Sequence, residues 1–125
     1  MQTVYILIGA PACGKTQWAL SNAKRLGAIV LAADAARDEI RRAGGDPFDG
    51  DRVFAVLDRR LREQLAMGQS SIIDATHWRR EYRAYAVDAA REVKARVIGV
   101  WFDVPLEVCL LRNDGRMGSS PGLRR

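Results

Sequence analysis

The stretch that decides the fold is GAPACGKT, from Gly9 to Thr16, which directly follows the apolar run at residues 4–8. The octapeptide matches the pattern GxxxxGK[ST] at every defined position. Its glycines allow the backbone to wrap around a phosphate group, and the amides of a following helix N-terminus point toward that group. The sequence therefore predicts a buried strand, a phosphate-binding loop and a helix in immediate succession.

This loop predicts the binding of a nucleoside triphosphate, with ATP and Mg²⁺ as the cofactors. The expected ATP contacts are all eight loop residues: Gly9, Ala10, Pro11, Ala12, Cys13, Gly14, Lys15 and Thr16. The Lys15 ammonium is expected to bridge the β- and γ-phosphates and to act in catalysis, and the Thr16 hydroxyl is expected to coordinate Mg²⁺. The Cys13 thiol is either a reactive group in an electropositive loop or a small residue that fills its position.

Apolar runs and segments of helical spacing alternate along the rest of the chain. The runs at 4–8, 28–32, 71–74 and 96–102 are typical of strands buried on both faces of a parallel sheet. Helices are expected at 15–26, at 51–67 with Asp51 as the N-cap, at about 79–94, and briefly after Pro105. In the third of these, Tyr82, Tyr85 or Ala86, Ala89 and Val93 are expected to face inward. The pattern predicts an α/β P-loop NTPase fold, with a parallel sheet of about four strands and helices on both faces.

Composition limits the class of protein. The 125 residues are 48% hydrophobic and 28% charged, which favours one globular domain, and the net charge of +5 favours an anionic partner. Two cysteines and one histidine fit neither a disulfide framework nor a zinc site. No apolar run approaches the roughly 20 residues that span a bilayer, so we expect a cytoplasmic protein without a membrane partner. The oligomeric state stays open.

A DxxR element follows the second predicted strand, at the strand end where ligands bind in open α/β sheets. Asp34 and Arg37 would lie one turn apart if a helix begins there. The Asp34 carboxylate could then accept the proton of an attacking hydroxyl, and Arg37 could hold an anionic acceptor. The alternative is a helix N-cap with a surface ion pair.

The third predicted strand ends in IIDATH, residues 72–77, which brings another carboxylate to the same sheet edge. Asp74 resembles a Walker B carboxylate, and it could bind Mg²⁺ through water or contact the acceptor. His77 is either a polar loop residue or a catalytic group. Farther along, Arg112 and Arg116 form either a lid over the transferring phosphoryl group or part of a basic solvated tail.

Taken in order, GAPACGKT, DAAR, IIDATH with Arg80 and Arg83 behind it, and FDVPLEVCLLRNDGR resemble the polynucleotide 5′-kinase branch of the P-loop kinases, which includes phage and bacterial repair kinases. The resemblance spans residues 4–116. It implies that Asp34 is the general base on a 5′-hydroxyl and that Arg37 contacts the acceptor phosphate. It also implies that Asp74 matches the strand-end aspartate and that Arg112 and Arg116 match the lid arginines, which contact ATP. Arg80 and Arg83 are further expected acceptor contacts.

The chain departs from this family pattern at three points. His77 replaces the usual asparagine, Ala32 and Ala33 stand where a serine or asparagine often precedes the DxxR element, and the family's segment and helix do not follow the lid. We therefore expect a kinase domain at 1–116 and a mobile tail at 117–125. The predicted function is ATP-dependent transfer of the γ-phosphate to a hydroxyl, with a single-stranded nucleic acid or nucleotide as acceptor. The alternatives are a small-metabolite kinase and a truncated ATP-binding module.

Overall fold

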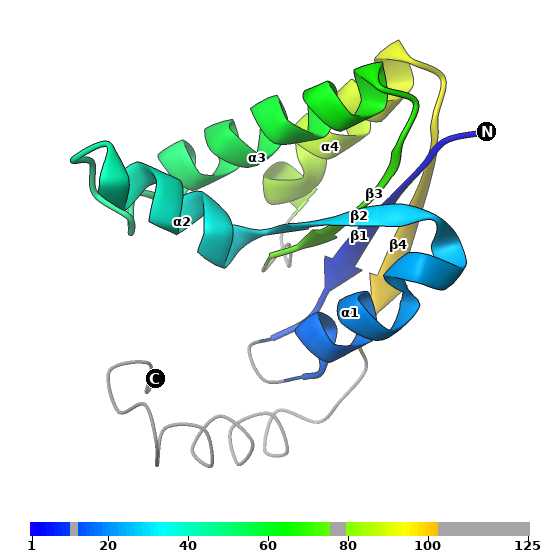
Figure 1. Ribbon diagram of the computed structural model, residues 1–125, viewed down its shortest axis with the longest axis horizontal. Helices are drawn as coiled ribbons and strands as arrows, with labels where there is room; N and C mark the ends of the chain where they lie inside the picture. The colour runs from blue at the N-terminus through cyan, green and yellow to red at the C-terminus, as the bar shows by residue number, and fades with distance from the viewer. Residues whose placement is uncertain (11–12, 76–79, 103–125) are drawn as a thin grey trace.

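The computed structural model describes residues 1–10, 13–75 and 80–102 (Figure 1). Strands and helices follow one another as predicted, except that two helices connect β2 to β3: β1 (Thr3–Ile8), α1 (Lys15–Leu26), β2 (Ala28–Ala32), α2 (Ala33–Arg42), α3 (Gly50–Ala66), β3 (Ser70–Asp74), α4 (Arg80–Glu92) and β4 (Arg96–Trp101). None of the helices in these ranges is both long and apolar enough to cross a membrane. The short helix expected after Pro105 lies outside the described residues.

The four strands form one parallel sheet in the order β2-β3-β1-β4. Figure 1 shows α1 on one side of this sheet and α2, α3 and α4 on the other. The predicted α/β fold, with about four parallel strands and helices on both faces, is confirmed. Because parallel neighbours need crossover connections, each strand returns to the sheet through one or more helices.

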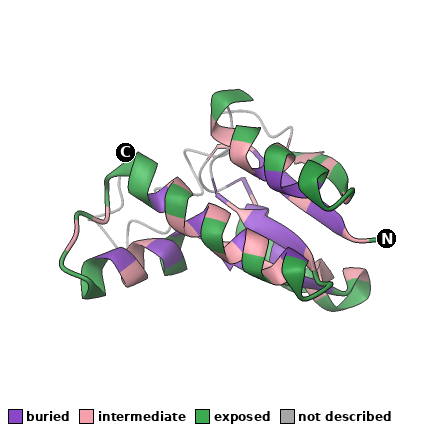
Figure 2. Cartoon of the chain, turned by 90° about the horizontal axis from the view of Figure 1, so that it is seen from above, coloured by how far each residue is buried: buried purple, intermediate pink, exposed green. Residues whose placement is uncertain are grey.

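Two apolar cores lie on the two faces of the sheet, because successive residues of a strand point to opposite sides. On the first face, Ile6 and Ile8 of β1 pack in the cluster that contains Leu57 and Leu61 of α3. On the second face, Leu7 packs with Ala19 of α1. Figure 2 shows the buried sheet between helices whose outer surfaces are exposed.

The two edge strands of the sheet are less buried than the sequence pattern predicts. The run at 96–102 does not form a strand buried on both faces, because β4 pairs only with β1 among the described residues. Val97 and Trp101 are exposed on it. Ile29 of β2, at the opposite edge, is exposed for the same reason. Apolar composition alone does not distinguish an edge strand from a central one.

The helix boundaries correct two further expectations. The N-cap of α3 is Asp49 rather than Asp51, since the Asp49 carboxylate accepts hydrogen bonds from the amides of Asp51 and Arg52. Val93 lies beyond the end of α4 and is exposed, whereas Ala90 is buried with Ala86 and Ala89. The first helix, α1, has the predicted bounds, and its C-cap is Gly27 in the left-handed conformation, φ 61°.

Candidate active site

The candidate site lies at the carboxyl ends of the three strands β1, β3 and β2. Strand β3 is the direct neighbour of β1, and Asp74 at its end is in register with Ala32 at the end of β2. The phosphate loop follows β1 and α2 follows β2, so both begin at this edge. The topology therefore brings the loop, Asp74 and the DxxR element to one side of the molecule, where open α/β sheets bind ligands.

The lysine near the end of the phosphate loop, Lys15, contacts the start of the same loop. Lys15 Nζ donates hydrogen bonds of 2.8 Å to the carbonyl of Gly9 and 2.9 Å to that of Ala10. Gly14, with φ 102°, is the N-cap of α1, so its backbone needs a conformation that side chains disfavour. Pro11 and Ala12 lie outside the described residues. In the described part of the loop, the ammonium group is thus held against the carbonyls of the loop's first two residues.

Close packing explains two small residues of this loop. A Cβ on Gly9 would lie 2.6 Å from Cys13 Sγ and 3.0 Å from the Cβ of Phe102. Cys13 is 3% exposed, and its Sγ lies 3.9 Å from Lys15 Nζ. Burial restricts the access of thiol reagents, which favours the interpretation of Cys13 as a residue that fills its position.

Two side chains with oxygen atoms that could coordinate a metal ion are in contact between α1 and β3. The Thr16 hydroxyl donates a 2.7 Å hydrogen bond to Asp74 Oδ2. A hydroxyl and a carboxylate are ligands that suit Mg²⁺, an ion usually held by few protein groups together with phosphate oxygens and water. In the described ranges no group of three or more His, Cys, Asp or Glu side chains is arranged to hold a metal. The residues therefore fit a magnesium ion that arrives with a nucleotide better than a resident metal centre.

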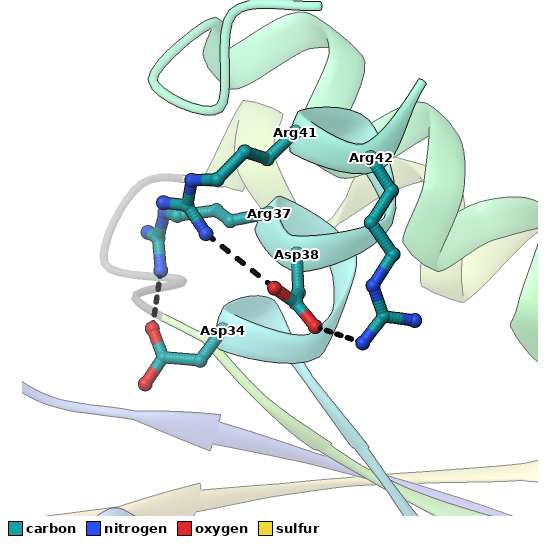
Figure 3. Close-up of polar contacts among 5 residues, drawn as sticks. All are labelled: Asp34, Arg37, Asp38, Arg41 and Arg42. Carbon is teal, nitrogen blue, oxygen red and sulfur yellow. Dashed lines mark hydrogen bonds and ion pairs between the residues drawn. The ribbon is translucent and has the colours of Figure 1, made fainter. Parts of the chain in front are cut away.

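The DxxR element forms the first turn of α2, as Figure 3 shows. Arg37 donates a 2.7 Å hydrogen bond from Nη1 to Asp34 Oδ1, and the two side chains are 37% and 96% exposed. The next acidic residue of the helix, Asp38, forms ion pairs with Arg41 and Arg42. Asp34 is therefore open to solvent and to an incoming molecule, with a guanidinium beside it.

Arg37 of this pair lines a cavity of about 430 Å³. Its lining comes from α2, from the loop before α3, from the first turns of α3, from Ala75 and from α4. Three aromatic residues take part, Phe48, Phe54 and Tyr82, together with the charged residues Arg37, Asp49 and Asp51. The volume lies in the range of roughly 300–1,000 Å³ that small-molecule sites occupy.

An ion-pair cluster links α2 and α3, two of the helices that line the cavity. Glu39 Oε1 of α2 accepts hydrogen bonds of 2.7 Å from Arg59 and from Arg60 of α3. These two hydrogen bonds lower the pKa of Glu39 to about 2. The carboxylate stays charged at neutral pH, so it holds α2 and α3 together beside the site.

Arg80 and Arg83, two further predicted site residues, are not among the residues that line the cavity. Arg80 is exposed at the start of α4. The guanidinium of Arg83 lies over the ring of Trp101, 5.8 Å from its centroid, and so at β4 rather than at the edge formed by β2. His77, Arg112 and Arg116 lie outside the described residues, as does the tail at 117–125. The roles expected of these residues stay predictions.

The aromatic lining of the cavity escaped the sequence interpretation. The segment Gly44 to Gly50, GGDPFDG, has the composition of an ordinary turn-rich connection. The one available signal was Phe48, a large apolar residue between turn formers. Phe54 and Tyr82 follow helical spacing, so the sequence assigns them to a core and gives no sign that they also border a cavity.

Comparisons with solved structures agree on the fold. A candidate kinase from Chloroflexus aurantiacus J-10-fl is 21% identical with a TM-score of 0.80, and the match covers 99% of this chain and 72% of that one. The APS kinase CysC of Mycobacterium tuberculosis, in complex with AMPPNP and APS, is 23% identical with a TM-score of 0.72. That match covers 95% of this chain and 71% of the other. No curated protein matches the chain.

A third likeness is to a chain of the Pnkp1/Rnl/Hen1 RNA repair complex, with 26% identity and a TM-score of 0.75. That match covers 94% of this chain but only 38% of the other, so this chain spans well under half of that relative. A family model for an AAA domain matches residues 4–122, nearly the full length. The chain therefore belongs to this AAA domain family.

Proposed function

We propose that this protein is an ATP-dependent phosphotransferase that moves the γ-phosphoryl group to a hydroxyl, namely the 5′-hydroxyl of a nucleotide or polynucleotide. The observation that carries the proposal is the exposed Asp34–Arg37 pair, whose arginine lines a cavity at the same sheet edge as the phosphate loop. A nucleotide-binding module without turnover needs neither an open carboxylate nor an adjoining acceptor cavity. A phosphotransferase needs both.

On the donor side, Lys15 would exchange its two carbonyl partners for phosphate oxygens when ATP binds. Because the side chain is already held within the loop by these two hydrogen bonds, little ordering would be required. Thr16 and Asp74 would hold Mg²⁺, which when bound neutralises phosphate charge. In this proposal the lid arginines, Arg112 and Arg116, contact ATP and exclude water, and Arg116 acts in catalysis.

On the acceptor side, Asp34 would accept the proton of the attacking hydroxyl. The oxygen of that hydroxyl forms a bond to the γ-phosphorus while the bond from that phosphorus to the β-phosphate oxygen breaks, which releases ADP. Arg37 would hold the acceptor phosphate, with Arg80 and Arg83 as further contacts. The proton then passes from Asp34 to water and restores the carboxylate.

The named relatives are consistent with nucleotide chemistry, since one is an APS kinase in complex with AMPPNP and APS and another belongs to an RNA repair complex. A second candidate is a kinase of a small metabolite. The cavity favours it through its two carboxylates, Asp49 and Asp51, which oppose an acceptor with many negative charges. Both candidates share the single kinase domain at 1–116 and a cytoplasmic location.

The test is phosphoryl transfer from γ-labelled ATP to a panel of 5′-hydroxyl oligonucleotides, nucleoside 3′-phosphates, nucleosides and sugars. Asp34→Asn should lower kcat by roughly 10² while ATP affinity changes by only a few-fold, because the carboxylate acts on the acceptor proton alone. Asp88→Asn, the same change on an exposed residue of α4, is the control. Near-normal turnover of Asp34→Asn would remove this residue from the mechanism.

A further inference from the structure

The cavity that Arg37 lines has an exposed aromatic residue, Phe48, at its border. Phe48 is 81% exposed, although a phenyl ring in water is unfavourable. Two hydrogen bonds give its loop a defined conformation. The Phe48 amide donates a 2.9 Å hydrogen bond to Asp46 Oδ1, and the Asp49 amide donates a 3.2 Å hydrogen bond to the Asp46 carbonyl. A large apolar side chain held in solvent at the border of a cavity is suited to stack on a planar ring.

The interior of the cavity is aromatic as well. The rings of Phe54 and Tyr82 are stacked, 5.5 Å between centroids with an interplanar angle of 21°. Phe54 also contacts Tyr85, at 5.6 Å and 40°. Burial raises the pKa of Tyr85, so its hydroxyl stays neutral. Phe54 and Tyr82 both line the cavity, which therefore offers flat apolar surface from two helices as well as from Phe48.

The two carboxylates of the lining differ in what they already bind. Asp49 Oδ1 accepts the amide hydrogens of Asp51 and Arg52 and is engaged in capping α3. Within the part of the chain that the structure describes, the Asp51 carboxylate takes part in no hydrogen bond or ion pair, and Asp51 is one of the residues that line the cavity. Asp51 therefore presents hydrogen-bond acceptors, and no donors, to whatever enters.

We propose that this cavity binds the base of the acceptor nucleotide, with the ring stacked on Phe48 and an exocyclic amino group donating to Asp51. Adenine, cytosine and guanine carry such an amino donor, whereas uracil and thymine carry carbonyl oxygens instead. A volume of about 430 Å³ suits one nucleotide unit. The inference deepens the proposed function and rests on it: Asp51 selects amino-bearing bases, and Phe48 binds all bases.

Equilibrium binding of mononucleotides tests the inference without requiring turnover. Calorimetric titration of the full chain, saturated with Mg²⁺ and a non-hydrolysable ATP analogue, would compare 3′-AMP, 3′-CMP and 3′-GMP with 3′-UMP. One charge-assisted hydrogen bond predicts about tenfold tighter binding of the three amino-bearing nucleotides. In Asp51→Asn, whose amide can also donate to the uracil carbonyl, the ratio should fall to within about twofold.

Controls separate base recognition from the effect of a charge in the first turn of a helix. Asp51→Ser, which keeps a residue suited to a helix start, should also abolish the preference, whereas Asp88→Asn should leave it intact. Phe48→Ala should weaken the binding of all four nucleotides by roughly tenfold and leave the ratio of their affinities unchanged, as expected for stacking. Leu20→Ala removes an exposed apolar side chain from a different element, α1, and should leave all four affinities unchanged.

The inference is overturned if 3′-UMP binds as tightly as the other three, if no mononucleotide binds, or if Asp51→Asn retains the tenfold ratio. Its failure is distinct from failure of the proposed function. Phosphoryl transfer that ignores the base would leave the kinase assignment standing and remove the role of Asp51. Selective binding of mononucleotides without transfer to any hydroxyl would support the base site and remove the kinase assignment.

Discussion

The Thr16 hydroxyl donates a 2.7 Å hydrogen bond to Oδ2 of Asp74, a residue 58 positions farther along the chain. This bond joins the first turn of α1 to the end of β3, so it connects the phosphate loop to the centre of the sheet. It exists because β3 is the direct neighbour of β1, which the loop follows. Thr16 of the phosphate-loop motif and Asp74 at the end of a distant strand thus form one pair of possible metal ligands.

Asp74→Asn is expected to weaken magnesium dependence without unfolding the site. The asparagine oxygen can still accept from Thr16, but the negative charge that attracts a divalent cation is lost. The Mg²⁺ concentration for half-maximal phosphoryl transfer should rise about 10- to 100-fold, the range found when groups around a metal are altered. Titration of activity with Mg²⁺ measures this, with Asp88→Asn as the control. An unchanged titration midpoint would assign Asp74 to the acceptor instead.

Local patterns were sufficient for much of the fold and for part of the site. The octapeptide at 9–16 requires a strand before it and a helix after it, and α1 has the predicted bounds. The approach of Asp74 to Thr16 follows from strand order, which the sequence interpretation had to assume. The shift of the α3 cap from Asp51 to Asp49 was not predictable, because both aspartates are favoured caps and only the path of the preceding loop decides between them.

The cavity that Arg37 lines could not be predicted from the sequence, for a different reason. Its lining comes from separate segments that meet only after α2 and α3 have packed, so no spacing within one helix reveals it. The same applies to Arg83, whose stacking on Trp101 depends on where α4 crosses the sheet. Residues on one element are predictable from periodicity, whereas contacts between elements depend on the tertiary arrangement.

Glu39 predicts a specific acid dependence of stability. Its pKa is about 2 in the folded protein, below the ordinary value of 4.5, because Arg59 and Arg60 donate to its charged form. A lowered folded pKa stabilises the protein above the unfolded value, and this contribution is lost as pH falls from about 4.5 toward 2. Glu39→Gln should therefore be less stable than the wild type at pH 7, and the difference should shrink through this window.

Urea unfolding at a series of pH values from 7 to 3 would measure this difference. Asp88→Asn serves as the control for removing one negative charge from an exposed helix position. A stability difference between Glu39→Gln and the wild type that stays constant from pH 7 to pH 3 would contradict the ion-pair explanation.

Two neighbouring serines of β3 should respond to substitution in opposite directions. The Ser71 hydroxyl is fully buried and has no hydrogen-bond partner among the described residues, whereas Ser70 Oγ accepts a 3.0 Å hydrogen bond from the Thr3 amide. Ser71→Ala should raise the free energy of unfolding by about 1 kcal/mol, since an unsatisfied buried group is removed. Ser70→Ala should lower it by about 1 kcal/mol. Chemical denaturation of both variants measures the pair, and destabilisation by Ser71→Ala would reveal a partner for its hydroxyl.

Arg37 should set part of the salt dependence of acceptor binding if the acceptor is a nucleic acid. Each phosphate that a cation neutralises releases condensed counterions, and the slope of log K against log salt is about −0.7 per contact for a single strand. Arg37→Ala should weaken binding of a 5′-hydroxyl oligonucleotide and make the slope shallower by about 0.7. Its ATP affinity should stay nearly unchanged, because Arg37 lines the acceptor cavity and not the phosphate loop. Arg41→Ala, on the same helix but paired with Asp38 outside the cavity, is the matched control. If both variants give the wild-type slope while transfer to a free nucleoside equals transfer to the oligonucleotide, the acceptor is a small molecule and the nucleic-acid assignment is wrong.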